Sequence, residues 1–538
     1  MGKSGFGFTV LFIFISLFLA GCSIFFPYTI SIEVTPIEGG TVEISPSANR
    51  YGEGDIITLE ARAEDGFVFS AWEGDLSGYS SEEELFMDGD KNITAFFEST
   101  EPRDWTIMVY LDGDNNLEAE AFLDMEAMEQ GFRAAEDAGT GFPDNSYILV
   151  LVDCLGESDD YGWSGTRLYR LRSDGGTAEI DSERLDDGAG GFGHLGTLGE
   201  LNMGDPATLS WFIERCMSFF PSDKYGLILW NHGGGARGLE PRGICEDSEN
   251  DDILNLNEVQ QAVSSGFTSE DKLAFLGMDA CLMGTVEVAY EFRNLVSYMT
   301  FSPANEWGGW AYDDIFGTMT GSTTPEELAK MAAEAYKEKS LAYGLTQNTQ
   351  TAADLGSITA LKTALDNLAA AFSGSGDKTT IEGLRDSATH YYSTEYVYEP
   401  IAWPYFEIGS LCDKITASGP SVEISTALGS VKSALEDVIV YAWAGSESGG
   451  YDGAGIGHGL SVFFSRGEQL YSSESHYAYQ WWYTDTAFTG ATDGGIDFAD
   501  SDTDGTVETW REIFEKWYDP YIPPYNSETD SLKTPGAY

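Results

Sequence analysis

The segment LAFLGMDACLMGTVEVAYE, from Leu273 to Glu291, decides the fold. It opens with an apolar run that is typical of a buried strand, and it becomes helical near Thr285. A buried strand that leads directly into a helix is the repeating unit of a parallel α/β sheet. The segment therefore predicts an α/β fold and puts Cys281 at the carboxyl end of a strand.

The flanking sequence repeats this alternation. Further apolar, mostly β-rich runs predict strands at Trp105–Leu111, Tyr147–Asp153, Tyr225–Asn231, Leu295–Ser302 and Gly459–Ser465. Helical periodicity predicts helices at Glu118–Ala135, Pro206–Phe219, 325–343, 357–372, 421–443 and Val507–Tyr518. Strands that alternate with helices predict a mostly parallel sheet covered on both faces.

Residues 27–98 have a different pattern of short strands and turns. Strands are predicted at Thr29–Val34, Gly40–Ile44, Ile56–Ala61 and Ile93–Phe97. Landmarks such as Gly39-Gly40, Trp72 and Asn92-Ile93-Thr94-Ala95-Phe96-Phe97 resemble the InlB-type B-repeat of bacterial surface proteins. The resemblance implies a small all-β or β-grasp-like module that acts as a stalk or binding unit.

Composition narrows the possible partners. The 538 residues include 28 Lys+Arg against 89 Asp+Glu, which gives a formal net charge of −61. Such a surface repels phosphate backbones and anionic lipid headgroups, so nucleic-acid binding is excluded. It attracts cations and basic polypeptides, and a hydrophobic fraction of 42% is enough for a sizeable core.

The N-terminus predicts export. Thr9–Ala20 is an apolar run after a single cation, too short for a membrane span and suited to a signal peptide. It ends in Leu19-Ala20-Gly21-Cys22, which resembles the lipobox of bacterial lipoproteins. We therefore expect lipidation at Cys22 and anchoring at the cell surface or in the periplasm, on the outer membrane if the host has one. An ordinary secretory signal is the alternative.

These observations divide the chain into six parts. The parts are a signal peptide (1–21), a lipid-anchored tether (22–26), the repeat module (27–98), a linker (99–104), the α/β domain (105–520) and a loose tail (521–538).

Five cysteines follow Cys22, an odd number, so at least one thiol stays free or pairs between chains. The sequence does not fix the oligomeric state.

A histidine and a cysteine end two of the predicted strands. Tyr225–Asn231 runs into His232-Gly233-Gly234, and the strand at Leu273 runs into Asp279-Ala280-Cys281. The carboxyl ends of parallel strands meet at one edge of a sheet, where function gathers. A cysteine near an imidazole and a helix N-terminus has a stabilised thiolate, so the pair predicts a nucleophile and its base.

Together the motifs Asn231-His232-Gly233-Gly234 and Asp279-Ala280-Cys281-Leu282-Met283-Gly284 resemble the clostripain-like cysteine peptidases, family C11. Trp105–Asp112, Leu201–Pro206 and His458–Phe464 extend the resemblance over roughly residues 104–520. It implies a caspase-like fold and a cysteine endopeptidase that needs no cofactor for its chemistry.

The resemblance also implies residue roles. Cys281 would be the nucleophile and His232 the general base and acid. The backbone N–H groups of Cys281 and of Gly233 or Gly234 would stabilise the oxyanion. Protein or peptide substrates would be cleaved after Arg, and in some members after Lys.

A cationic substrate side chain needs an anion in its pocket. Asp279 matches the acid that the family uses, and side-chain alternation puts it on the same side as Cys281. A second acid is expected in the loop that follows the next strand. The candidates there are Glu306, Asp313 and Asp314. Trp307 and Trp310 are candidates for the pocket walls or for the core.

Two further properties follow from the resemblance and from acidic loops. Family members often cut themselves between the histidine and the cysteine, and here the candidate sites are Arg242, Arg237 and Lys272. Structural Ca²⁺ is expected either in the acidic stretch Glu246–Asp252 or at Asp500, Asp502 and Asp504, which open like an EF-hand loop. The latter motif lacks its bidentate acid at Arg511.

Two alternatives stay open. An inert peptidase fold could leave the repeat module as the working part of a surface-binding lipoprotein. A pocket lined by Arg would instead favour cleavage after Asp.

Overall fold

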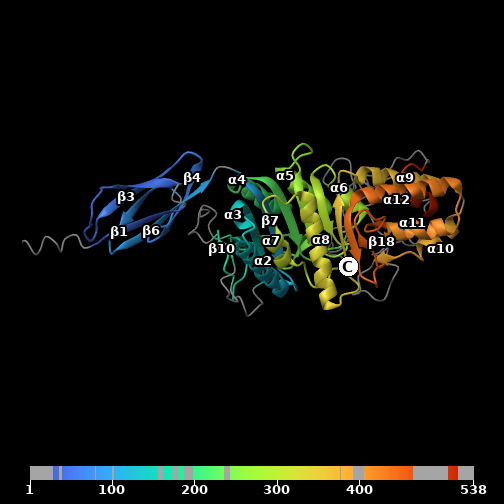
Figure 1. Cartoon of the computed structure of the whole chain (residues 1–538), viewed down its shortest axis with the longest axis horizontal. Coiled ribbons are helices and arrows are strands. Elements are labelled where there is room, and N and C mark those ends of the chain that lie inside the picture. The colour runs from blue at the N-terminus through green and yellow to red at the C-terminus, as the bar shows by residue number, and fades with distance from the viewer. Residues whose placement is uncertain are drawn as a thin grey trace, which may run out of the picture. The chain divides into compact units, whose positions relative to one another are not determined.

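The structure is a computed structural model of the whole chain. It describes residues 28–35, 39–78, 80–99, 102–155, 162–173, 180–186, 198–235, 243–375, 377–391, 405–464 and 507–518. The chain divides into two compact units, with the main boundary after Pro102 (Figure 1). The predicted signal peptide, Cys22, the tether and the tail all lie outside the described residues.

The N-terminal unit consists of two three-stranded sheets. One has the order β1-β6-β4, from Ile30–Thr35, Lys91–Ser99 and Phe67–Gly74, and the other β2-β3-β5, from Gly40–Ser45, Ile56–Ala63 and Glu82–Phe86. The four strands that the sequence predicts are present, and β4 and β5 are additional. The described part of residues 28–99 contains no helix, which favours the all-β form of this module over a β-grasp.

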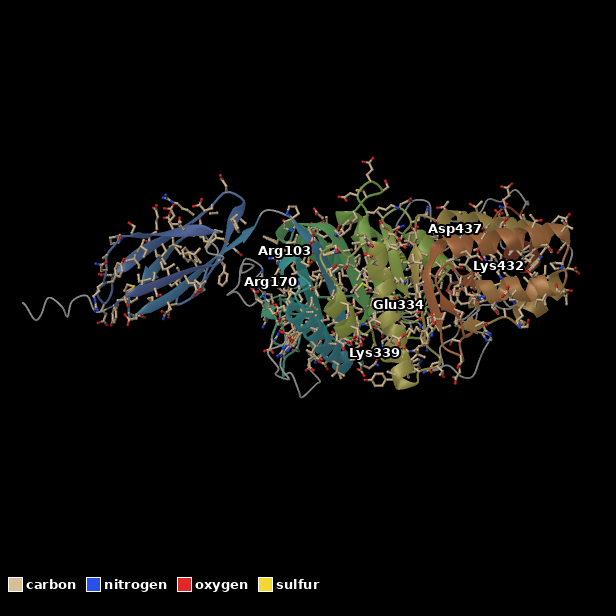
Figure 2. The ribbon with its side chains drawn as sticks, in the orientation of Figure 1. Arg103, Arg170, Glu334, Lys339, Lys432 and Asp437 are labelled. Carbon is tan, nitrogen blue, oxygen red and sulfur yellow. The ribbon has the colours of Figure 1, made fainter. Side chains whose placement is uncertain are left out.

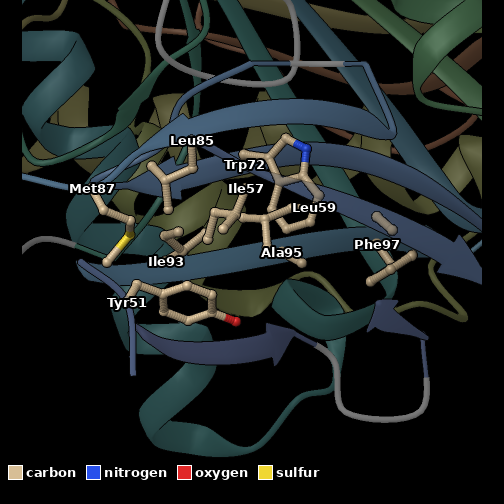
Figure 3. Packing of buried hydrophobic residues seen from close by; sticks show 10 residues of the cluster. Tyr51, Ile57, Leu59, Trp72, Leu85, Met87, Ile93, Ala95 and Phe97 are labelled. Carbon is tan, nitrogen blue, oxygen red and sulfur yellow. The ribbon is translucent and has the colours of Figure 1, made fainter. Parts of the chain in front are cut away.

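The core of this unit lies between the sheets. Trp72 is fully buried among Ile57, Leu59, Ala95 and their neighbours (Figure 3), and its indole N–H donates to the Ser80 carbonyl at 2.9 Å. The β3 pattern, in which Ile57, Leu59 and Ala61 face inward, is the period-two alternation of a half-buried strand. The burial of this face explains why the module folds as a β sandwich.

The larger unit contains a ten-stranded sheet of order β10-β9-β8-β7-β11-β14-β15-β16-β19-β20. Its centre is five parallel strands: β8 (Ser146–Cys154), β7 (Arg103–Gly113), β11 (Ser222–Trp230), β14 (Leu273–Asp279) and β15 (Val296–Phe301). The antiparallel strands β16 (Thr349–Asp354), β19 (Ile439–Ala444) and β20 (Asp452–Gly453) extend one edge, and β9 (Arg167–Arg170) and β10 (Glu183–Arg184) extend the other. The predicted mostly parallel α/β fold is confirmed.

Several helices begin at capping signals of the sequence. Asp205 caps α4 by accepting from the Ala207 N–H, and Thr324 forms a capping box with Glu327 at the start of α8. The bounds are α2 Glu118–Ala138, α3 Phe142–Asn145, α4 Pro206–Phe219, α5 Leu256–Gly266, α6 Val286–Glu291, α7 Tyr312–Thr318, α8 Pro325–Tyr343, α9 Ile358–Ser375, α10 Lys378–Arg385, α11 Ile408–Ala417, α12 Val422–Val438 and α15 Trp510–Tyr518. Short strands complete the unit: β12 Ile244–Asp247, β13 Asp252–Leu254, β17 His390–Tyr391, β18 Tyr405–Glu407 and β21 Ser461–Phe463.

The order of the parallel strands creates a switch point between β7 and β11. The chain passes from β7 through α2 to β8 on one side, and then through α4 to β11 on the other side of β7. Right-handed crossovers put α2 and α4 on opposite faces of the sheet, so the chain leaves β7 and β11 toward different faces. A crevice at the carboxyl ends of the strands is expected at such a point.

One predicted helix is wrong in its last part. The segment 421–443 is helical only over α12, after which Ile439–Ala444 forms β19 and pairs with β16. The apolar periodicity continues across the boundary, but the β-branched and aromatic residues of IVYAWA fit a sheet edge better than another helical turn. In the described part of the chain no helix is long and apolar enough to cross a membrane.

Replacing Trp72 with Ala is expected to destabilise the N-terminal unit by about 3–5 kcal/mol, because it opens a cavity and leaves the Ser80 carbonyl without its donor. Hydrogen exchange followed by mass spectrometry on the full chain would show exchange in β3 and β6 faster by about 10²-fold or more. Peptides from residues 103–464 should be unaffected.

The matched control is Val68→Ala on the same strand, where the side chain is 49% exposed. Its effect should stay within about 0.5 kcal/mol. Equal protection in the Trp72 variant and the wild type would contradict this view of the core.

Candidate active site

The pairing of β11 with β14 fixes the positions of the predicted histidine and cysteine. The two strands are parallel, and Trp230 is the register partner of Asp279. Two residues further along each strand stand His232 and Cys281. The register continues past the strand ends, since the Asn231 N–H donates to the Asp279 carbonyl at 3.3 Å. His232 and Cys281 therefore occupy equivalent positions on neighbouring chain segments.

Gly233 shows how closely these segments approach. A Cβ atom at this position would lie 2.3 Å from the Cys281 carbonyl oxygen and 2.9 Å from the Cys281 nitrogen. Any side chain larger than hydrogen would push the two loops apart. The glycine after the histidine thus permits the contact that brings the histidine loop to the cysteine.

The thiol of Cys281 contacts the loop that follows β15. Its Sγ accepts from the Glu306 N–H at 3.3 Å. The predicted helix is present as α6, but it starts at Val286, where Thr285 caps the Val288 N–H. Cys281 therefore precedes the helix by more than a turn, and a backbone N–H, rather than the helix dipole, is the donor placed against the sulfur.

His232 has a partner that the sequence analysis did not assign. Its Nε2 lies 3.0 Å from Oδ1 of Asn116, which belongs to the loop after β7. An amide oxygen accepts, so Nε2 carries the proton and Nδ1 is the unprotonated nitrogen. Asn116 lies three residues beyond the end of β7, and this location at the switch point is the signal that could have identified it.

The two candidate oxyanion donors from the glycine loop differ. The Gly234 N–H donates to the Gly243 carbonyl at 3.1 Å. The Gly233 N–H makes no hydrogen bond to another described residue. Gly233 is therefore the better candidate, together with the Cys281 N–H.

Asp279, which is buried, and Glu306, which is half-buried, come together near Cys281. Asp279 is 5% exposed, and its Oδ2 accepts from the Tyr312 hydroxyl at 2.9 Å and from the Trp310 N–H at 3.2 Å. Burial raises the pKa of Asp279 to about 6, against these hydrogen bonds and the charge of Lys339. Oε1 of Glu306 accepts from the Gln350 amide at 2.6 Å and the Trp310 indole at 3.1 Å.

The environment of Glu306 favours its neutral form. Burial raises its pKa well above the usual range, and the charge of Asp279 adds to this. Its Oε2 is buried and has no hydrogen-bond partner among the described residues. An unpaired buried carboxylate oxygen next to a second acid is costly unless a cationic group joins it.

A third acid, Asp124, was missed by the sequence analysis. It lies on the buried face of α2, and its Oδ2 accepts from the Trp230 indole at 2.8 Å. Burial and the charge of Asp279 raise the pKa of Asp124 to about 8. An acid within the apolar stripe of α2 is the signal in the sequence. Lys339 of α8 (Figure 2) donates to the Trp310 carbonyl at 2.8 Å and lowers the pKa of both aspartates.

The other pocket candidates do not join this group. Asp313 and Asp314 are exposed in the first turn of α7, which packs on α2. The structure therefore does not support them as pocket acids. Trp307 is 41% exposed, whereas Trp310 is fully buried and belongs to the core beside Asp279.

Of the three predicted self-cleavage sites, only Lys272 lies within the described residues. Lys272 donates to the Arg293 carbonyl at 2.6 Å and precedes Leu273, a fully buried residue at the start of β14, which argues against cleavage there. Arg237, Arg242, Asp500, Asp502 and Asp504 lie outside the described residues. Of the five cysteines after Cys22, four are buried free thiols, and Cys281 alone is partly accessible.

A separate cavity of about 290 Å³ is lined by residues that include Glu407 and His458, but not by His232 or Cys281. His458 Nδ1 lies 2.9 Å from Glu407 Oε2, and its ring stacks on Tyr451. His458 is thus packed and hydrogen-bonded away from His232 and Cys281.

Comparison with known proteins identifies the chain. The model of the clostripain family matches residues 109–517. The chain belongs to the clostripain family. It is a cysteine-type endopeptidase.

Individual relatives agree with this family. The chain is 31% identical to clostripain of Hathewaya histolytica over 483 residues, which cover 77% of this chain and 87% of that protein. A secreted C11 cysteine protease of Bacteroides thetaiotaomicron, solved with an irreversible peptide inhibitor, aligns with a TM-score of 0.51 at 19% identity, over 74% of this chain and 100% of that one. The latter likeness concerns the fold. A model of the divergent InlB B-repeat domain matches residues 30–101, so the resemblance of the N-terminal module is confirmed.

Replacing Gly233 with Ala is expected to displace the histidine loop from Cys281, because the added Cβ would meet the Cys281 backbone at 2.3 Å. A displacement of about 1 Å should lower kcat/KM on a peptide amide by about 10²-fold or more. Steady-state kinetics would measure the fall in kcat/KM, and thermal unfolding would show whether the variant is folded.

Gly429→Ala in α12 is the control, since a Cβ there meets nothing within 4 Å. It should leave kcat/KM unchanged and add about 0.5–1 kcal/mol of stability. Wild-type kinetics in the Gly233 variant would refute the close approach.

Proposed function

We propose that this member of the clostripain family is an exported, lipid-anchored endopeptidase that uses Cys281 and His232 and cleaves after Arg, or after Lys. The observation that carries the proposal is the register of β11 and β14, which brings His232 and Cys281 to equivalent strand-end positions with Gly233 packed against the Cys281 backbone.

The proposed chemistry uses side chains, backbone N–H groups and water. Nδ1 of His232 takes the proton of the Cys281 thiol, and the thiolate attacks the scissile carbonyl carbon. The tetrahedral oxyanion accepts from the N–H groups of Cys281 and Gly233. The C–N bond then breaks, and the amine leaves with the proton from His232. Water, deprotonated by His232, hydrolyses the thioester and restores the thiol.

Asn116 orients the base in this scheme. By accepting from Nε2–H, it holds the imidazole in the tautomer whose Nδ1 is free to take a proton. The Glu306 N–H against Sγ stabilises the thiolate.

The acidic group supports recognition of a cationic side chain. Asp279 is buried and Glu306 is half-buried near the nucleophile, and an Arg guanidinium that pairs with both would give the buried Glu306 Oε2 the hydrogen-bond donor that it lacks among the described residues. An Arg-lined pocket that would accept Asp has no support here, because the acids of this group attract a cation.

Lipid anchoring and self-cleavage belong to the same proposal. Lipidation at Cys22 would tether the enzyme outside the cytoplasm, with the B-repeat module as a stalk. Self-cleavage between His232 and Cys281 would occur at Arg242 or Arg237 rather than Lys272, whose neighbour Leu273 is buried. Structural Ca²⁺ in the acidic stretch Glu246–Asp252, or at Asp500, Asp502 and Asp504, stays a prediction.

Hydrolysis of fluorogenic peptide amides tests the proposal directly. The full chain should release the reporter after Arg, and after Lys more weakly or equally, but not after Ala or Asp. Cys281→Ala and His232→Ala should each reduce kcat by about 10³-fold or more.

Cys412→Ala is the matched control, since this buried thiol lies on α11, remote in sequence from both motifs. Folded protein that cleaves none of the peptides, even after treatment with trypsin, would favour a surface-binding lipoprotein without activity.

The pKa of Asp279 predicts a pH-dependent preference. With a pKa of about 6, this carboxyl is ionised above pH 6 and neutral below it. The ratio of kcat/KM for an Arg peptide to that for an Ala peptide should fall about tenfold from pH 7 to pH 5. Taking the ratio cancels every effect of pH that the two peptides share.

Asp279→Asn should lower this ratio by about 10–100-fold at pH 7 and make it independent of pH. Asp313→Asn, at an exposed position on α7, should behave like the wild type. A ratio that is unchanged in Asp279→Asn would remove Asp279 from the pocket.

A further inference from the structure

The residue that follows the nucleophile has a strained backbone. Leu282 has a φ of 65°, in the left-handed region that glycine favours and that leucine rarely adopts. Its side chain is 1% exposed, so this conformation does not belong to an open surface loop. A residue keeps such a conformation only when the surrounding structure holds it there, and residues of this kind gather at active sites.

The loop after β15 holds Leu282 through the backbone. The Leu282 N–H donates to the Ala304 carbonyl at 2.9 Å. The same loop supplies the Glu306 N–H that donates to the Cys281 sulfur at 3.3 Å. The turn from β14 to α6 is thus fixed to the segment that supports the thiol.

The three-stranded sheet β17-β18-β21 holds the same turn. Tyr391, in β17, is buried in one cluster with Leu282 and Ala304, and Cys281 packs against this cluster. In β21 the Ser461 N–H donates to the Gly284 carbonyl at 3.1 Å. Side-chain packing and a backbone hydrogen bond from this sheet therefore both act on the residues after Cys281.

The histidine loop also approaches Leu282. A Cβ atom at Gly235, three residues after His232, would lie 2.9 Å from the Leu282 carbonyl oxygen. Leu282 therefore packs against the loop after β15, the histidine loop and the cluster that includes Tyr391. Each of these segments restricts the turn on which Cys281 stands.

We propose that Leu282 is a positioning residue for Cys281, and that Tyr391 keeps Leu282 in its left-handed conformation. This conformation turns the chain just after β14, which directs the Cys281 thiol toward His232. A strained strand-to-helix turn exposes the nucleophilic serine of α/β-hydrolases in the same way. The role of Leu282 in catalysis rests on the proposed function; its hold on the Cys281 backbone does not.

Loss of these contacts would let the turn relax. A leucine is less stable in the left-handed region than in the ordinary backbone regions, so Leu282 would leave it. Cys281 would then rotate relative to the loop after β15. Its sulfur would lose the Glu306 N–H and the approach to His232, which are the groups placed to stabilise the thiolate.

Alkylation of Cys281 by iodoacetamide in the full chain, measured by mass spectrometry of the peptide that contains it, tests the proposal. In Leu282→Ala the pH midpoint of the alkylation rate should rise by about one unit or more, because the thiol ionises less readily. Leu282→Met keeps a long apolar side chain and should retain the wild-type midpoint. The matched control is Leu209→Ala in α4, which packs on α5 and β7. This variant should lose stability without a change in the midpoint.

Two variants of Tyr391 separate positioning from stability. The Tyr391 hydroxyl lies 3.1 Å from the Tyr451 hydroxyl and donates to the Ser448 carbonyl at 3.3 Å. Tyr391→Phe loses these bonds but keeps its ring in the cluster, so its Tm should fall while the alkylation midpoint stays that of the wild type. Tyr391→Ala also loses the ring, and its midpoint should rise as in Leu282→Ala. Equal midpoints in the two variants would overturn the role of Tyr391, and this pair decides the question if Leu282→Ala does not fold.

Steady-state kinetics on an Arg peptide amide give a second readout. Leu282→Ala should lower kcat by about 10²-fold, because the nucleophile is displaced from the scissile carbonyl. Its KM should stay within about twofold of the wild-type value, because Asp279 keeps its position at the end of β14. A raised KM with an unchanged kcat would contradict a role in positioning the nucleophile.

A comparison of Leu282→Gly with Leu282→Ala tests the strain itself. Both variants lose the buried side chain, but only glycine adopts a positive φ without a steric penalty. The Tm of Leu282→Gly should therefore equal or exceed that of Leu282→Ala, whereas glycine lowers Tm at ordinary positions. A clearly lower Tm in Leu282→Gly would contradict the left-handed conformation.

The outcomes separate this inference from the proposed function. The expected midpoint shifts in a chain that hydrolyses no peptide would keep the hold on Cys281 and remove the peptidase function. Hydrolysis with wild-type kcat and wild-type midpoints in Leu282→Ala and Tyr391→Ala would keep the peptidase function and overturn the inference.

Discussion

The parallel pairing of β11 with β14 is the constraint on which the rest of this structure depends. Backbone hydrogen bonds fix the register of Trp230 with Asp279 at the centre of a ten-stranded sheet. His232 and Cys281 lie two residues beyond this pair, in loops that start from buried strands. Gly233 completes the arrangement, because it is the position at which the two strand ends touch.

Buried acids lie at the same edge of the sheet, and their burial distinguishes them from the acids of the surface. Most acids of a chain with a net charge of −61 can lie on the surface, where water solvates their charge. Asp279, at the end of β14, and Asp114, directly after β7, are instead buried with raised pKa values. A cationic substrate side chain at Asp279 would offset the desolvation of that acid.

Local sequence signals predicted most elements of the α/β unit. The bounds of α4 were predicted to the residue, because its apolar periodicity and its Asp205 cap are local features. The strand β19 was mistaken for the end of a helix, since pairing with β16 decided its state. The short helix α6 was predicted, but its distance from Cys281 and the Glu306 N–H on the sulfur were not.

The sequence by itself determined the fold class, the family, and the two strand ends that carry His232 and Cys281, because these follow from short-range periodicity and compact motifs. Only the tertiary structure decided the partners of these residues. Asn116 meets His232, and Asp124 joins Asp279, across more than a hundred residues of chain. Such contacts depend on strand order and register, which side-chain periodicity along one segment cannot encode.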